Sequence, residues 1–194
     1  MNLPWYISVP ADSPLDQGDI IFDCPVVSWK DEPIAIAENG EESGVLKSRV
    51  ELSTADVVVM TQTCDLAEQK VHYVILCPHF DLAEYRKSWE DAERNRSQTP
   101  TDKSWGKFLD RVAAGQSWNL SLLNREQRND LKAPHRIVDF HEVLSLPRDF
   151  LESWLMRKGS ARLRLCPPYR EHLSQAFARF FMRVGLPSGI EKCW

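Results

Sequence analysis

The stretch Asp56–Phe80, DVVVMTQTCDLAEQKVHYVILCPHF, contains two strongly apolar runs and most of the chemically reactive residues of the chain. The first run, Asp56–Met60, and the second, His72–Cys77, are rich in β-branched and aliphatic side chains, which is typical of buried strands. The polar segment 61–65, TQTCD, lies between them. Functional side chains are often carried by loops that rigid strands position. This loop is therefore the first candidate site.

The composition is that of an ordinary globular protein, with 194 residues of which 43% are hydrophobic and 27% charged. A chain of this length fits one domain, so we expect a single domain over residues 1–194. No apolar run approaches the roughly 18–20 residues that cross a bilayer, and the N-terminus lacks a basic start followed by an apolar stretch. The sequence thus predicts a cytoplasmic protein that does not enter a membrane.

The net charge and the cysteines argue against two classes of protein. A formal net charge of −4 argues against non-specific binding of nucleic acid. The five cysteines are odd in number and widely spaced, which favours reduced thiols over a disulfide framework.

The N-terminal third is expected to form strands and loops. Three prolines make residues 1–17 an extended lead-in, and the acidic, turn-rich segment 30–44 reads as an exposed loop. The remaining expectations before Asp56 are a strand at Ile20–Val27 interrupted at Pro25, a half-exposed strand at Val45–Leu52, and a turn at Ser53-Thr54-Ala55.

The rest of the chain alternates helices and strands. Asp65-Leu66-Ala67-Glu68 fits a capping box that begins one helical turn. Pro78 is expected to end the strand His72–Cys77. Helical spacing of Leu82, Tyr85, Trp89 and then Trp105, Phe108, Val112 predicts two helices within 81–115. Further predicted elements are strands at Trp118–Leu123, Ile137–Val143 and Ala161–Leu165, and a helix at Phe150–Met156.

The C-terminal segment 167–185 shows the clearest helical pattern. Leu173, Phe177, Phe180, Phe181 and Val184 form one apolar stripe. The prolines at 167–168 suit a helix start and Gly185 suits its end. We therefore expect a C-terminal amphipathic helix.

The order of these elements resembles a known family. A strand opening with Gly18-Asp19-Ile20-Ile21, the Val-rich strand Val57–Met60, and Val74-Ile75-Leu76-Cys77-Pro78 are similar to the MazF/PemK-like toxins. The resemblance implies an α+β fold: an SH3-like antiparallel β-barrel with strands in 18–80 and 116–166 and a helical insertion at 81–115. It also implies ribonuclease activity on single-stranded RNA, dimerisation and silencing by an antitoxin peptide.

The active site implied by this resemblance does not carry over. Where the family has a catalytic Arg before the Val-rich strand, this chain has Ser53-Thr54-Ala55-Asp56, and where it has Ser or Thr after the next strand, this chain has His79 and Phe80. RNA cleavage needs a base for the 2′-hydroxyl and a cation for the phosphoryl charge. The resemblance therefore supports the barrel more than the activity.

A second likeness concerns two phrases, TQTCDL at 61–66 and PPYREHL at 167–173. Both resemble an uncharacterised group of bacterial proteins found beside defence and signalling genes. The likeness implies an accessory protein that engages a protein partner.

Cys64 and Asp65 are the candidate catalytic residues of the loop, together with His79. A thiol near a helix N-terminus can have a lowered pKa and act as a nucleophile. The alternative is that Cys64 is a small buried residue and Asp65 a helix cap. A Cys64-dependent enzyme remains open on the sequence.

A zinc site is conceivable from Cys64, His72, Cys77 and His79, with Cys24 as a further ligand. The spacing lacks any CxxC or HxxxH pattern, and His72 and Cys77 fall on opposite faces of a strand. We therefore expect no metal and no cofactor.

Five arginines make the C-terminal region locally basic: Arg162, Arg164, Arg170, Arg179 and Arg183. They predict a cradle for a phosphate or an acidic partner segment. The alternative is a solvated face that pairs with Glu171 and the acidic loop at 38–42.

Together these patterns predict a non-catalytic binding or regulatory module with Gln62, Thr63, Arg170, Arg179 and Arg183 as binding residues. The alternative function is an endoribonuclease that uses His79, for which RNA is the substrate. The sequence does not define the oligomeric state.

Overall fold

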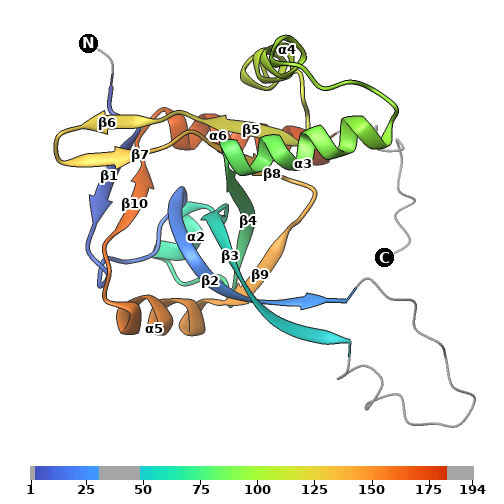
Figure 1. The fold of residues 1–194 in the computed structure, drawn as a ribbon. Helices are drawn as coiled ribbons and strands as arrows, with labels where there is room; N and C mark the ends of the chain where they lie inside the picture. Colours follow the sequence, from blue (N-terminus) through green and yellow to red (C-terminus); the bar gives the residue numbers. More distant parts are fainter. Residues whose placement is uncertain (1–2, 31–48, 183–194) are drawn as a thin grey trace, which may run out of the picture. The chain divides into compact units, whose positions relative to one another are not determined.

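The structure, a computed structural model, describes residues 3–30 and 49–182 (Figure 1). It mixes helices with antiparallel strands, so the predicted α+β class is confirmed. By its internal contacts the chain divides into two compact units. Unit 1 comprises Met1–Ile7, Phe80–Glu142 and Leu165–Trp194, and unit 2 comprises Ser8–His79 and Val143–Arg164. The single domain expected over residues 1–194 stays a prediction.

Unit 2 contains the stretch Asp56–Phe80 except for its last residue. Its two apolar runs form β3 (Val50–Val59) and β4 (Tyr73–Asp81), which pair antiparallel with Val58 opposite Cys77. On the other side β3 pairs with β2 (Asp19–Trp29), which in turn pairs with β10 (Arg162–Leu165). The strand β9 (Leu144–Pro147) pairs with β4.

One face of this sheet carries the core of unit 2. Val57, Val59, Val74 and Leu76 are fully buried there, because alternate residues of neighbouring strands point to the same face. Leu151 and Leu155 of α5 (Arg148–Lys158) pack against them. The helix predicted at Phe150–Met156 is thus confirmed and longer than expected.

The SH3-like barrel is not confirmed. In unit 2 the strand path runs β10–β2–β3–β4 with β9 beside β4, and within the described residues it does not return to its start. A barrel has no edge strands because its first and last strands pair. The antiparallel sheet here is open.

The β2–β3 hairpin corrects two sequence predictions (Figure 1). Pro25 does not interrupt β2; it lies opposite Thr54, beyond the part of β2 that pairs with β10, where its missing N–H leaves no ladder bond unmade. Segment 53–55 is strand rather than turn, since Val26 opposes Ser53. The irregularity lies instead between Ile21 and Cys24, where Asp23 has a positive φ of 51°.

Two further expectations about Asp56–Phe80 are wrong in detail. The short helix α2 (Thr63–Ala67) has Gln62 as its N-cap without a side-chain hydrogen bond, so Asp65 lies inside the helix and no capping box forms there. Pro78 does not end β4, which continues to Asp81, because Pro78 lies beyond the residues that pair with β9.

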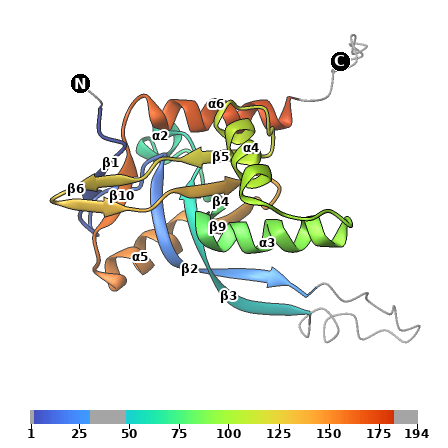
Figure 2. The ribbon, with the colours of Figure 1, turned by 45° about the horizontal axis from the view of Figure 1, so that its top comes forward.

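Unit 1 contains the two helices predicted within 81–115, as α3 (Leu82–Asn95) and α4 (Asp102–Ala113). Figure 2 shows them joined by a loop, and α3 contacts β8 (Arg136–Asp139) while α4 contacts β5 (Leu120–Leu123). The two strands, which the sequence predicted within Trp118–Leu123 and Ile137–Val143, pair antiparallel. A small core of Val112, Leu120 and Ile137 lies beneath the helices.

The remaining elements of unit 1 differ from the expectations in extent. The charged segment after β5 forms a hairpin of β6 (Glu126–Arg128) and β7 (Leu131–Ala133), which the sequence did not indicate. The predicted C-terminal helix is confirmed as α6 (Tyr169–Phe181), with Leu173 of the predicted apolar stripe buried and Phe181 exposed. Its predicted stripe residue Val184 and Gly185 lie outside the described residues.

The lead-in at 1–17 contains a strand, β1 (Tyr6–Val9), where only extended chain was expected. The predicted loop at 30–44 and the start of the strand predicted at Val45–Leu52 fall largely outside the described residues. Among the described helices, none has the length and apolar character needed to cross a membrane.

Candidate functional site

The loop between β3 and β4 is held in place by its own polar side chains. The Thr63 hydroxyl donates to the Asp16 carboxylate, and the Thr61 hydroxyl accepts from the backbone N–H of Ile75 at 2.7 Å. Thr61 is buried and Thr63 half-buried, so both serve the fold. Of the two predicted binding residues in this loop, Gln62 and Thr63, only Gln62 is exposed.

Cys64 is exposed, contrary to its alternative reading as a buried residue. Its thiol lies 3.7 Å from Oε1 of Gln62 and 3.8 Å from Oδ1 of Asp65, both oxygen acceptors that offer no positive charge to stabilise a thiolate.

The thiol of Cys64 is expected to react with a thiol reagent much faster than the thiol of Cys24. Cys24 is fully buried, and burial raises its pKa to about 12 from 9.0, so it stays protonated at pH 8 and reacts only when unit 2 opens. A disulfide reagent at pH 8 should therefore modify Cys64 in the native protein, as mass spectrometry of the peptides would show. Prompt native-state modification of Cys24 would contradict this placement.

Of the three candidate catalytic residues, Cys64 and Asp65 lie together, but His79 does not join them. The His79 side chain is buried and its ring meets Phe22 edge-on with centroids 5.6 Å apart. The loop with Cys64 and Asp65 joins the start of β4, where Thr61 contacts Ile75. His79 lies four residues further along the strand, about 13 Å away at the usual rise.

No metal centre forms from the predicted ligands. Among residues 3–30 and 49–182 no group of three His, Cys, Asp or Glu side chains is arranged to hold an ion. Cys24 and Cys77 are instead buried in unit 2.

The predicted arginine face is also divided. Arg170 pairs with Glu171 at 2.8 Å, as the structural alternative expected. Arg179 lies nine residues later on α6, which places it on the opposite side of the helix. Arg183 lies outside the described residues. Arg162 and Arg164 of β10 are not a surface patch, because both pair with the buried Asp19 carboxylate in unit 2.

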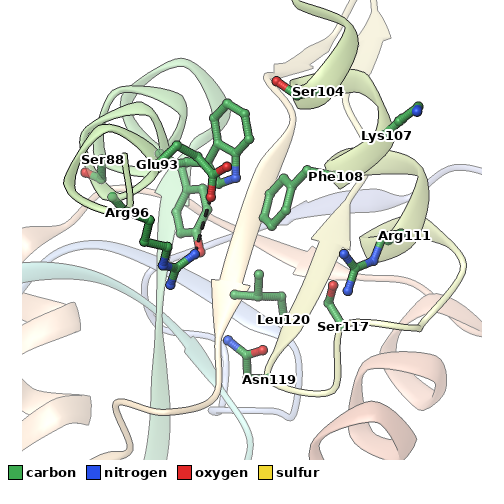
Figure 3. A pocket seen from close by; sticks show the side chains of 13 residues that line it. Ser88, Glu93, Arg96, Ser104, Lys107, Phe108, Arg111, Ser117, Asn119 and Leu120 are labelled. Carbon is green, nitrogen blue, oxygen red and sulfur yellow. Dashed lines mark hydrogen bonds and ion pairs between the residues drawn. The ribbon is translucent and has the colours of Figure 1, made fainter. Parts of the chain in front are cut away.

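A different site appears in unit 1, as a cleft of about 630 Å³ between α3 and α4, hereafter the α3–α4 cleft (Figure 3). Its volume falls within the usual range of ligand sites. Four kinds of side chain line it, of which the aliphatic ones are Ala92 and Leu120. The aromatic ones are Tyr85, Trp89 and Phe108, the charged ones Arg96, Lys107, Arg111 and Glu93, and the uncharged polar ones Ser88, Ser104, Ser117 and Asn119.

Helical periodicity places these residues on facing surfaces. Tyr85, Trp89 and Arg96 share one side of α3, and Ser104, Phe108 and Arg111 share one side of α4, since positions three, four and seven apart lie on one face.

The ends of both helices are fixed by local hydrogen bonds. The Asp81 carboxylate accepts from the N–H of Ala83, and Thr101 and Ser104 form a reciprocal capping box. After α4, Gly115 adopts a φ of 67°, a turn conformation that glycine accepts without strain and that leads into Ser117–Leu120.

Aromatic packing and one ion pair dock α3 on α4. The Phe108 ring lies 5.3 Å from that of Trp105, 5.7 Å from that of Trp89 and 6.2 Å from that of Tyr85, centroid to centroid. Arg86 of α3 pairs with Asp102 of α4 and lies over the Trp105 ring at 5.9 Å. The ring faces are thus used largely within the protein. Burial raises the pKa of Tyr85 to about 12, so its hydroxyl stays neutral.

The cleft carries excess positive charge. Arg96 pairs with Glu93 at 3.3 Å, but Lys107 and Arg111 have no ion-pair partner among the described residues. They lie one turn apart on α4, an arrangement of like charges that costs a few tenths of a kcal/mol in a helix. An anionic ligand would remove that repulsion.

Sequence reasoning missed this site. It identified both helices and their aromatic residues, and the spacing of Lys107 and Arg111 was visible as a pair of cations on one helix face. What it lacked was the docking of α3 on α4, which the aromatic contacts specify only in three dimensions.

Comparisons with known proteins do not assign the chain to a family. No protein-family model, no curated protein and no solved structure matches it.

Proposed function

We propose that the chain is a non-catalytic binding module that engages a protein partner through the α3–α4 cleft. Its role is that of a regulatory accessory protein in a bacterial multi-gene system of the defence or toxin–antitoxin kind, acting in the cytoplasm. The observation that carries the proposal is the cleft itself, where two helices present aromatic and cationic side chains to one concave surface.

A protein ligand fits this lining better than single-stranded RNA. Binding of RNA bases uses open aromatic faces on which each base stacks. Here Tyr85 and Phe108 stack on each other at 13° and Trp89 packs on Phe108, which leaves mostly ring edges for a ligand. Edges and aliphatic surface suit apolar side chains, and the arginines suit carboxylates.

The charge of unit 1 agrees with this choice. Its sequence has 15 Lys and Arg residues against 13 Asp and Glu, whereas unit 2 has 9 against 15. An acidic partner segment is therefore attracted to unit 1 rather than to unit 2.

The separation of the candidate catalytic groups supports a non-catalytic role. General acid–base catalysis needs a side chain within hydrogen-bond reach of the reacting proton. His79 is buried against Phe22, whereas Cys64 is exposed on α2, in the segment that precedes β4. The endoribonuclease alternative therefore has no favouring observation beyond the resemblance of its strands.

Lys107→Glu is expected to abolish capture of the partner, because it reverses one of the two unpaired charges in the cleft. The matched control is Lys103→Glu, one turn earlier on α4, exposed and outside the cleft lining. Both changes alter the net charge equally. The measurement is quantitative mass spectrometry of proteins captured from the native host by each tagged variant.

Proteins retained by the wild type and Lys103→Glu but lost with Lys107→Glu would support the proposal. Equal recovery by all three baits, with the helical circular dichroism unchanged, would refute the cleft as the partner surface.

A further inference from the structure

The arrangement of charged and apolar side chains in the α3–α4 cleft favours a ligand with an apolar group as well as negative charge. Figure 3 shows the guanidinium groups of Arg96 and Arg111 on opposite sides of the cleft, with Phe108 and Leu120 between them. Arg96 comes from the end of α3 and Arg111 from the last turn of α4. Two cations are therefore separated by an apolar floor.

Arginine is suited to carboxylates in such a position. Its planar guanidinium presents two parallel N–H donors that match the two oxygens of a carboxylate. Arg96 uses Nη1 toward Glu93, in an exposed ion pair that is cheap to rearrange, and its other donors remain available to a ligand.

The floor between the arginines is apolar. Leu120 is 6% exposed and belongs to the core beneath the helices, and Phe108 is half-buried beside it. A ligand side chain that covers both must be apolar, because a polar group there would lose its hydration without gaining a full set of hydrogen bonds.

We propose that the α3–α4 cleft binds a peptide segment in which acidic side chains lie on both sides of an aliphatic side chain. The inference rests on the proposed function, and it names the chemistry of the partner segment. The acidic groups pair with Arg96 and Arg111, the aliphatic group covers Phe108 and Leu120, and the peptide N–H groups meet Glu93 and the polar rim at Ser117 and Asn119.

The chemistry of the rim disfavours a nucleic acid in this cleft. Glu93 beside Arg96 offers an acceptor to peptide N–H groups, whereas a phosphate backbone has no N–H to donate. The aromatic rings pack on one another, so their faces are used largely within the protein rather than for stacking a base.

The test uses fluorescein-labelled peptides with Glu-Leu-Glu in a Gly-Ser context and fluorescence anisotropy with the full chain. We expect saturable binding of this probe. Gln-Leu-Gln and Glu-Ser-Glu probes should each bind at least about tenfold more weakly, because each removes one of the two required features. Arg96→Gln and Arg111→Gln should weaken Glu-Leu-Glu binding by a similar factor, whereas Lys103→Gln leaves it unchanged.

Equal affinity for Gln-Leu-Gln, or binding of a labelled oligouridine in place of the peptide, would overturn the inference. The inference would also be overturned if capture of the partner depended on Lys107 but the Glu-Leu-Glu probe did not bind. That pair of results would still support the proposed function. Using one variant from each helix ensures that a local folding defect in either one does not decide the outcome.

Discussion

Asp19→Asn is expected to lower the free energy of unfolding of unit 2 by about 3–5 kcal/mol, the usual cost of breaking a buried ion pair by removing one partner. The Asp19 side chain is fully buried. Its Oδ2 accepts from Nε of Arg162 at 2.8 Å and from Nη2 of Arg164 at 3.0 Å. Asn preserves the volume but removes the charge, so Arg162, which is 4% exposed, is left without its anion.

The Asp19 network also fixes the chain before β2. Arg162 donates to the carbonyl groups of Pro10, Ala11, Ser13 and Pro14, and the backbone N–H of Asp16 donates to Oδ2 of Asp19. Loss of the carboxylate therefore weakens the attachment of residues 10–16 as well as the pairing of β2 with β10.

Urea denaturation followed by circular dichroism measures this effect. The matched control is Asp23→Asn, on the same strand, whose exposed carboxylate pairs with Lys158 at 3.3 Å. Asn tolerates the positive φ of that position, and an exposed ion pair contributes at most about 1 kcal/mol. Equal denaturation midpoints for the two variants would show that Asp19 does not stabilise unit 2 as described.

Trp105→Ala is expected to destabilise unit 1 by about 3–5 kcal/mol, as for other large aromatic truncations in a core. Trp105 is 8% exposed, and its ring lies 5.1 Å from that of Trp89 and 5.3 Å from that of Phe108. Its removal leaves a void between α3 and α4. The walls of the α3–α4 cleft then lose their fixed spacing.

The control for this change is Trp118→Ala, because Trp118 is 53% exposed. It should cost less than about 1 kcal/mol, the scale of surface substitutions. Denaturant unfolding gives both values, and anisotropy with the Glu-Leu-Glu probe should show binding lost only with Trp105→Ala. Comparable destabilisation by both variants would mean that the aromatic cluster does not dock the helices.

Elements with a strong period were predictable from the sequence. The aromatic residues at helical spacing identified α3 and α4, and the apolar stripe identified α6, because side chains that share one side of a helix recur at its period. The strands of Asp56–Phe80 were predicted from their continuous runs of β-branched and aliphatic residues. Their pairing is confirmed, whereas the barrel implied by the family resemblance is not.

Proline and charge misled the sequence reading where neighbours decide the outcome. Pro25 and Pro78 suggested strand ends, but both lie within strands. Pro25 lies beyond the residues of β2 that pair with β10, and Pro78 lies beyond the residues of β4 that pair with β9, so neither proline interrupts these pairings. Arg162 was expected to belong to a locally basic C-terminal surface, yet it pairs in the interior with Asp19, 143 residues away. Such long-range ion pairs leave no local pattern.

Amide hydrogen exchange of the chain with and without the captured partner tests most directly whether the partner binds the α3–α4 cleft. We expect slower exchange on binding in the segments that line the cleft, 85–96 and 104–120. We expect no change in the loop at 61–67. Protection confined to that loop, or to α6, with the cleft unaffected, would show that the partner binds elsewhere.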